Sequence, residues 1–143
     1  MPQENHLQTA RRFVAAFDAK SWNDYANLAT PDVVYEEKAT QRRSEGAGQM
    51  VELFQGWARA FPDARGKITS CFGSGDLVAL EVTWTGVHSG PLSTSDATIA
   101  ASGKSISLPA AYILAFQSGK VREARHYFDL ADLLRQIGAP AKR

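Results

Sequence analysis

The segment from Ile106 to Phe116 constrains the fold of this chain more than any other stretch, because both of its faces are apolar. Alternate side chains of a strand point to opposite faces. One face carries Ile106, Leu108, Ala110, Tyr112, Leu114 and Phe116, and the other carries Ala111, Ile113 and Ala115. A strand of this kind must be covered on both sides. The sequence therefore predicts a strand with the protein core on one face and the second subunit of a homodimer on the other.

Periodicity elsewhere in the chain predicts an α+β fold. Apolar residues recur at helical intervals in residues 5–19, 22–28, 49–60 and 130–137. Alternating or β-branched runs predict strands at residues 33–38, 67–72, 80–85, 106–116 and 121–128. We therefore expect one domain over residues 1–143. It would have a curved antiparallel sheet, three N-terminal helices over the concave face and a short C-terminal helix.

Two segments between these elements are predicted to be irregular. Residues 39–48 are polar and are expected to form a loop. Residues 89–104 are rich in Ser, Thr, Gly and Ala, and are long enough for a flap over an opening. A plain hairpin connection is the alternative for this second segment.

The composition is that of a globular protein without an evident macromolecular partner. The 143 residues carry a formal net charge of +1, so the chain has no general attraction to nucleic acid or to an anionic membrane. It holds no apolar run near the ~20 residues that span a bilayer, and its first residues do not resemble a secretory signal. Cys71 is the only cysteine, which excludes an intrachain disulfide. We expect a cytoplasmic protein that binds neither nucleic acid nor membrane.

Short motifs follow one another along the chain in a characteristic order. They are Pro31-Asp32, Ala60-Phe61-Pro62-Asp63, Gly75-Asp76, Gly86-Val87-His88-Ser89-Gly90, Gly103-Lys104, Gly119-Lys120-Val121 with Glu123, and Asp129 with residues 133–138. In order and spacing this series resembles the SnoaL-like branch of the nuclear-transport-factor-2-like superfamily, which includes polyketide cyclases. The resemblance spans nearly the whole chain. It implies a cone-shaped fold with a pocket between the helices and the concave face of the sheet.

The resemblance implies that Asp129 is a general acid/base, because it matches the catalytic aspartate of the characterised cyclases. A carboxylate in an apolar pocket has a raised pKa and is a stronger base towards a proton next to a carbonyl. The alternative is that Asp129 caps the helix that it precedes. Arg125 and Tyr127 share its strand parity, so we expect them to face the pocket. Arg125 would be catalytic, hold Asp129 ionised, or pair with Glu123 at the surface. His126 has the opposite parity and is expected on the outer face.

Aromatic side chains at helix or strand spacing are expected to line the pocket, although the same spacing is typical of an ordinary core. The candidates for substrate binding are Tyr35, Trp57, Phe61, Trp84, Tyr112 and Tyr127, with Glu36 as a polar group. His88 is a further candidate at the pocket mouth, and hydrogen bonding to backbone in a turn is its alternative role. A cavity with these walls suits a flat or hydrophobic small molecule.

Acid/base chemistry on an apolar or aromatic carbonyl compound is the function that these residues and the resemblance predict together. Aldol cyclisation without a cofactor is the first hypothesis. Epoxide hydrolysis, isomerisation or dehydration in the same pocket, or ligand binding without turnover, are the alternatives. No His, Cys or acidic residues have the spacing of a metal site, so we expect no metal.

Overall fold

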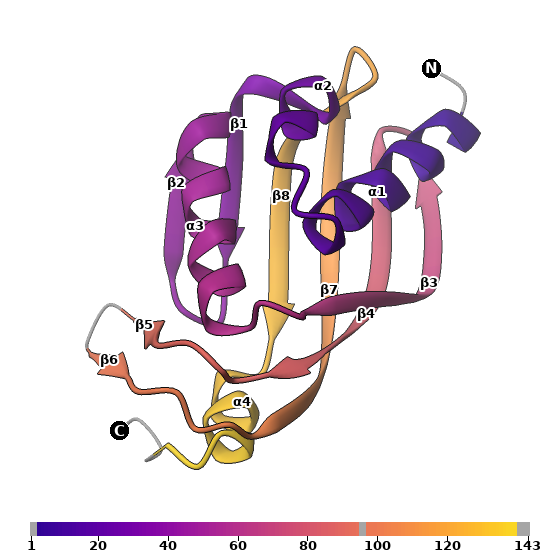
Figure 1. Cartoon of the computed structure of the whole chain (residues 1–143). Helices are drawn as coiled ribbons and strands as arrows, with labels where there is room; N and C mark the ends of the chain where they lie inside the picture. Colours follow the sequence, from indigo (N-terminus) through magenta and orange to yellow (C-terminus); the bar gives the residue numbers. More distant parts are fainter. Residues whose placement is uncertain (1–2, 95–96, 140–143) are drawn as a thin grey trace.

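The computed structural model describes residues 3–94 and 97–139 and has a mixed α+β architecture (Figure 1). Its helices are α1 (Gln3–Asp18), the 3-10 helix η1 (Trp22–Asp24), α2 (Tyr25–Leu28), α3 (Ala47–Ala60) and α4 (Leu130–Gln136). Its strands are β1 (Ala29–Glu37), β2 (Arg42–Glu45), β3 (Arg65–Ser74), β4 (Leu77–Val87), β5 (Leu92–Ser93), β6 (Thr98–Ile99), β7 (Ser105–Gln117) and β8 (Lys120–Phe128). None of the described helices is long and apolar enough to cross a membrane.

Six strands form one curved sheet in the order β2-β1-β8-β7-β4-β3. Neighbouring strands pair antiparallel, except for β1 and β8, which run parallel. Figure 1 shows α1, α2 and α3 on one face of this sheet, and α4 near the short β5–β6 hairpin at one end. The helices therefore cover the concave face, and this confirms the fold class that the sequence predicts. No helix in the described part of the chain covers the convex face.

The pairing of β7 with β8 decides which side chains face the helices. Tyr112 lies opposite His126, and Ile113 lies opposite Arg125. Tyr112 and His126 are buried on the concave side, whereas Ile113 and Arg125 are half-buried on the convex side. Because side chains alternate along a strand, this register separates β8 into two chemically different faces.

Strand β2 lies where the sequence predicts a polar loop. It pairs with the end of β1 and places Arg42 opposite Glu37. A tight turn reverses the chain between the two strands, with the Gln41 N–H donating to the Lys38 carbonyl and Gln41 at a positive φ of 58°. An edge strand next to water often carries charged side chains, so the polar composition of β2 concealed it.

The described residues of segment 89–104, which are 89–94 and 97–104, form a hairpin connection, the plainer of the two alternatives predicted for this segment. Strands β5 and β6 pair within it. At its start, the Ser89 and Gly90 N–H groups donate to the Ala60 carbonyl. At its end, the His88 N–H donates to the Lys104 carbonyl and the Gly103 N–H to the His88 carbonyl. Both ends of the segment are therefore attached to the end of α3 and to the sheet.

Candidate active site

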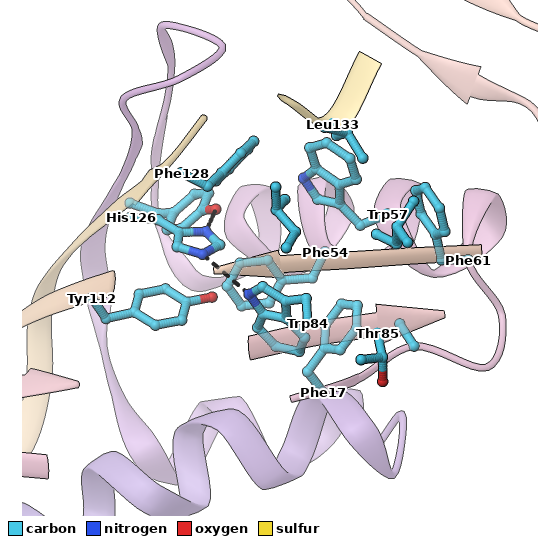
Figure 2. A pocket seen from close by; sticks show the side chains of 14 residues that line it. Phe17, Phe54, Trp57, Phe61, Trp84, Thr85, Tyr112, His126, Phe128 and Leu133 are labelled. Carbon is cyan, nitrogen blue, oxygen red and sulfur yellow. Dashed lines mark hydrogen bonds between the residues drawn. The ribbon is translucent and has the colours of Figure 1, made fainter. Parts of the chain in front are cut away.

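A cavity lies between the concave face of the sheet and the helices (Figure 2). It is lined by Phe17, Tyr35, Phe54, Trp57, Phe61, Ala64, Trp84, Thr85, Ile106, Leu108, Tyr112, His126, Phe128 and Leu133. Its volume is about 60 Å³, well below the ~300–1,000 Å³ of typical ligand pockets. As it stands the cavity admits a small group, and a larger ligand requires its walls to move.

Aromatic rings from helices and strands form most of the cavity wall. Phe54 and Trp57 are three residues apart on α3 and so project from one side of that helix. The Phe54 ring meets Tyr35 of β1 edge-on with 5.0 Å between centroids, and Phe17 of α1 meets Trp84 of β4 at 5.2 Å. Edge-to-face pairs of this kind are favourable beyond their buried area. They join α1 and α3 to the sheet around the cavity.

His126 is a polar group set within this aromatic wall. It lies on the concave face of β8, is 6% exposed, and stacks on Tyr112 with 4.0 Å between ring centroids. Its Nε2 lies 3.4 Å from Nε1 of Trp84 (Figure 2). Its Nδ1 lies 2.9 Å from the Tyr35 hydroxyl oxygen. Both ring nitrogens therefore have partners, and the contact at Nε2 is the longer and weaker one.

Donor and acceptor chemistry assigns the tautomer of His126. The indole Nε1–H of Trp84 is a donor only, so Nε2 of His126 accepts and carries no proton. In the neutral ring the proton then resides on Nδ1, which donates to the Tyr35 hydroxyl oxygen. The Tyr35 hydroxyl in turn donates to Glu37 Oε2 at 2.7 Å. A directed chain of hydrogen bonds thus runs from the cavity wall to a buried carboxylate.

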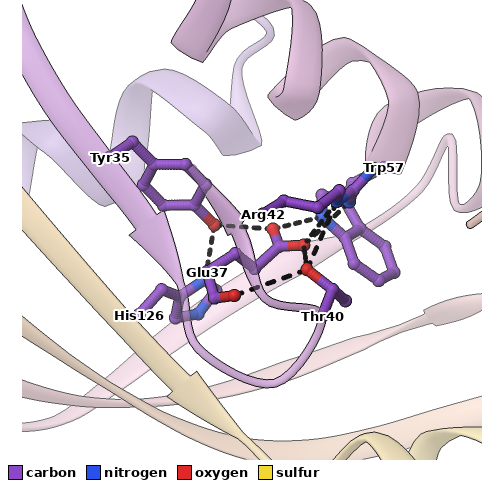
Figure 3. A network of polar contacts seen from close by, with 6 residues as sticks. All are labelled: Tyr35, Glu37, Thr40, Arg42, Trp57 and His126. Atoms are coloured by element: carbon purple, nitrogen blue, oxygen red, sulfur yellow. Dashed lines mark hydrogen bonds and ion pairs between the residues drawn. The ribbon is translucent and has the colours of Figure 1, made fainter. Parts of the chain in front are cut away.

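Glu37 is the centre of a buried polar network (Figure 3). Its side chain is 0% exposed. Oε2 accepts from Tyr35 and from Trp57 Nε1, both at 2.7 Å. Oε1 accepts from the Thr40 hydroxyl at 2.6 Å and from Arg42 through Nε at 3.1 Å and Nη2 at 2.7 Å. The carboxylate is therefore saturated with donors, as a buried charge must be.

The electrostatics of this network favour an ionised Glu37 and a neutral His126. Burial opposes ionisation of Glu37, but the Arg42 charge and the hydrogen bonds from Thr40, Arg42 and Tyr35 outweigh it, so its pKa lies below the usual 4.5. Burial lowers the pKa of His126 to about 4, against the opposing effect of the Glu37 charge. Burial, and then the Glu37 charge, raise the pKa of Tyr35 well above 10.

Tyr112 brings a second polar group to the cavity. Its ring is 5% exposed, and Figure 2 shows its hydroxyl directed towards Phe54 and Trp84. Within the described part of the chain no residue hydrogen-bonds to this hydroxyl. Burial raises its pKa well above 10, so the group keeps its proton. It is available as a hydrogen-bond donor to a ligand atom in the cavity.

Five of the predicted substrate-binding residues contribute to the cavity wall: Tyr35, Trp57, Phe61, Trp84 and Tyr112. They come from β1, α3 and its end, β4 and β7, so the fold gathers them from across the chain. Their role in binding a substrate stays a prediction. Because all five line one cavity, they could contact the same bound molecule.

The structure corrects the placement of Arg125, Tyr127 and Glu36, which the sequence predicts in the pocket. Arg125 lies on the convex face and pairs with Glu123 at 3.0 Å. Tyr127 is 40% exposed, and Glu36 pairs with Lys38 at 3.3 Å. The predicted parity of β8 was counted from Asp129, which lies beyond the end of the strand. Counted from the paired strand β7, the concave residues are Ala124, His126 and Phe128.

Asp129 is exposed and is not among the residues that line the cavity. Its backbone is extended, and its carboxylate accepts the Asp132 N–H at 3.0 Å. This is the geometry of a helix N-cap, the alternative that stood beside its predicted catalytic role. An exposed carboxylate lacks the apolar surroundings that its predicted function as a base requires.

His88 is fully buried but does not line the cavity. Its Nδ1 accepts the Ser102 N–H at 3.1 Å and lies 2.9 Å from the Ser102 hydroxyl, while its ring packs against Phe61. Burial lowers its pKa. The structure thus matches the alternative of hydrogen bonding to backbone next to a turn, and places His88 behind the pocket wall.

His126 and Glu37 are the polar residues of the site that the sequence did not identify as candidates. A signal for Glu37 was present, because it shares strand parity with Tyr35, a predicted pocket residue. His126 shares parity with the apolar Ala124 and Phe128, which indicates a buried face more clearly than Glu123, Arg125 and Tyr127 do. The parallel pairing of β1 with β8 then sets Glu37 opposite His126, and no short-range pattern contains that contact.

A curved sheet that encloses an apolar cavity under N-terminal helices defines this chain as a cone-shaped α+β protein. The SnoaL-like polyketide cyclase family matches residues 8–137, and the chain belongs to that family. No relative was found among proteins with curated functions.

Solved structures share this fold over nearly their whole length. A protein from Jannaschia sp. CCS1, provisionally named a SnoaL-like polyketide cyclase, superposes with a TM-score of 0.87 at 20% identity, covering 96% of this chain and 94% of its own. IdmH from Streptomyces antibioticus, provisionally named a polyketide cyclase, gives 0.77 at 19%, covering 92% and 97%. An LEH-like epoxide hydrolase from M. tuberculosis gives 0.72 at 16%, covering 94% and 90%. At these identities the likeness concerns the fold.

Proposed function

We propose that this protein is a cofactor-independent acid/base enzyme of the cyclase type, acting on a neutral hydrophobic or aromatic carbonyl compound. His126 is its general base. The observation that carries the proposal is the position of His126 Nε2, unprotonated at the cavity wall, with Nδ1 tied through Tyr35 to the ionised Glu37. A base of this kind needs a lone pair that the substrate can reach, here once the weak Trp84 contact opens, and a partner that stabilises the charge formed on protonation.

The proposed reaction moves one proton and conserves charge. His126 Nε2 takes a proton from the carbon next to the substrate carbonyl, after the weak contact from Trp84 opens. The imidazolium donates from Nδ1 to Tyr35, whose hydroxyl donates to Glu37. The enolate oxygen accepts a hydrogen bond from the Tyr112 hydroxyl. The enolate carbon attacks a second carbonyl of the same molecule, and the new alkoxide takes the proton back from His126.

The character of the cavity wall supports a neutral, apolar substrate. His126 and the hydroxyls of Tyr35 and Tyr112 are set among aromatic and aliphatic side chains, and no Lys or Arg of the described residues lines the cavity. An apolar site with few polar groups binds flat hydrophobic molecules and orients them through those groups. The described residues include no group of three or more His, Cys, Asp or Glu side chains placed to hold a metal ion.

Deuterium exchange on a model ketone tests the proposed base. In D₂O at pH 7, wild-type protein should accelerate exchange of the α-protons of 2-tetralone, followed by ¹H NMR. His126→Asn should lose about 100-fold or more of this acceleration, the usual contribution of a general base. Arg125→Gln and Asp129→Asn are matched controls on the same strand and the adjoining cap, and should stay within about two-fold of wild type. Exchange that persists in His126→Asn and is lost in Asp129→Asn would overturn the proposal.

Ligand binding without turnover is the second candidate, and the low pKa of His126, about 4, favours it because such an imidazole is a weak base. In that case 2-tetralone should quench the fluorescence of the cavity tryptophans without accelerated exchange. Epoxide hydrolysis has weaker support, since a carboxylate that activates water must reach the cavity and Glu37 is already saturated by its five donor contacts.

The convex face supports the predicted homodimer, which stays a proposal. Ala111 and Ile113 lie half-buried on it, and register places the exposed Leu77 and Tyr127 on the same face. Exposed apolar side chains that gather on one surface often mark an interface. Sedimentation at micromolar concentration should give a dimer, and a monomer there would contradict it.

A further inference from the structure

One oxygen of Glu37 connects two parts of the cavity wall. Oε2 accepts from the Tyr35 hydroxyl and from the Trp57 indole, each at 2.7 Å, whereas Arg42 and Thr40 donate to the other oxygen (Figure 3). Two donors that share one acceptor compete for its electron density, while hydrogen bonds in series polarise one another. The strength of the Tyr35 bond therefore depends on whether the indole is in place.

Trp57 belongs both to this network and to the cavity wall, which it reaches from the helix α3. It projects from α3, is only half-buried, and packs against Phe61 and Phe128. Its polar contacts are the bond to Glu37 and the Arg42 guanidinium 5.7 Å from its ring centroid. A cavity of about 60 Å³ must widen to admit most ligands. Rotation of Trp57 would widen it and would release Oε2 at the same time.

We infer that Trp57 is a positioning residue that controls the proton affinity of His126 through the shared Glu37 oxygen, so that moving the indole away makes His126 a stronger base. The inference rests on the proposed function only in giving His126 the role of base. Without the indole, Oε2 accepts more strongly from Tyr35, and the Tyr35 oxygen becomes a better acceptor for the Nδ1–H of His126. Protonation of His126 is then stabilised.

The other groups around His126 stay in place when Trp57 alone is changed. Tyr35 and Glu37 face it from β1, with Arg42 of β2 behind Glu37. Tyr112 stacks on it from β7, and Trp84 contacts Nε2 from β4. Among these, Glu37 and Arg42 carry the charges, and both are retained. A change in His126 titration on removing the indole N–H therefore reports the coupling or the hydration of the cavity.

NMR titration of ¹⁵N-histidine-labelled protein tests the coupling without any ligand. His126→Asn assigns the His126 signals among the three histidines of the chain. Wild type should show the Nδ1–H tautomer at pH 7. Trp57→Phe should raise the pKa of His126 by roughly half a unit, a fraction of one hydrogen bond, and move its Hδ1 resonance downfield.

Two further variants separate the coupling from other causes. Ile106→Ala enlarges the cavity without touching the network, and should change the pKa of His126 less than Trp57→Phe does. In a Tyr35→Phe background the link is cut, so adding Trp57→Phe should leave the titration of His126 unchanged.

An equal pKa shift in Ile106→Ala, or an undiminished shift in the Tyr35→Phe background, would overturn the inference. If a variant unfolds in acid, the Hδ1 chemical shift of His126 at pH 7 replaces the pKa as the measure of the coupling. A shift that behaves as expected, with full exchange activity in His126→Asn, would remove the proposed function and leave the coupling intact.

Discussion

The two faces of β8 show how differently one strand can use its polar residues. On the convex face, Arg125 pairs with Glu123, and their side chains are 30% and 28% exposed. On the concave face, His126 belongs to a network whose carboxylate, Glu37, is fully buried. Exposed ion pairs contribute little to stability because water screens them. In a buried network every lost partner leaves a desolvated charge or dipole behind.

The difference teaches that exposure, more than charge, indicates where chemistry can occur in this fold. Arg125 carries a full charge, but water reaches it, and its partner is Glu123 on the same face of the strand. His126 is neutral, and its surroundings determine its tautomer, its pKa and its direction towards the cavity. A general base needs that kind of control over its protonation state.

The largest expected effect comes from removing the Arg42 charge from the buried network on the concave face. Arg42→Met leaves the Glu37 carboxylate buried without its cation, and should lower the free energy of unfolding by about 3–5 kcal/mol. Arg43→Met is the matched control, because Arg43 is the next residue of β2, points to the other face and pairs with the exposed Glu45. It should cost less than about 1 kcal/mol. Urea denaturation at pH 7 measures both, and equal losses would contradict the assigned difference between the faces.

A smaller effect is expected from the titration of His126. Its pKa is about 4 in the folded protein and 6.5 when unperturbed. Between these values the unfolded chain binds a proton that the folded chain does not, so stability falls as the pH falls through this window. Folded wild type should lose about 2 kcal/mol between pH 7 and pH 5 from this group.

His126→Asn should lack this component of the pH dependence, whereas Arg125→Gln should retain it. Glu37 adds stability above its unperturbed pKa of 4.5 that is lost at lower pH, and this part should remain in His126→Asn. Denaturation curves at pH 5, 6 and 7 measure the difference. Parallel pH dependence in wild type and His126→Asn would show that His126 titrates normally in the folded protein.

The smallest effect is expected at the exposed end of β8. Asp129→Ala removes the side-chain acceptor for the Asp132 N–H and should cost about 1 kcal/mol of unfolding free energy. Asp129→Asn should cost only a few tenths, since asparagine caps a helix about as well as aspartate. Thermal unfolding of the two variants provides the measurement. A large loss in Asp129→Asn would indicate that the charge of Asp129 has a structural role beyond the cap.

Much of the fold could be predicted because period is a local property. The change from helical to alternating spacing near Lys67 predicted the sheet, and the two apolar faces of residues 106–116 predicted a central strand. The aromatic wall was also predictable, since Trp57, Trp84 and Tyr112 each lie on the apolar face of their own element. The polar network was not, because the contacts of His126 with Tyr35 and Tyr112 depend on how β8 pairs with β1 and β7. Parity along residues 121–128 favours a buried His126 but does not contain that pairing.

The sequence by itself determined the family, the order of the main helices and long strands, and the set of aromatic rings available to form a cavity. These follow from spacing and motifs that a single segment contains. Only the tertiary structure decided that His126 faces the cavity and that Arg125 and Asp129 do not. The physical reason is strand register: the pairing of β8 with β7 and β1 places His126 between Tyr112 and Glu37. Those contacts join residues more than ten positions apart, and burial then makes the pKa of His126 a property of the assembled fold.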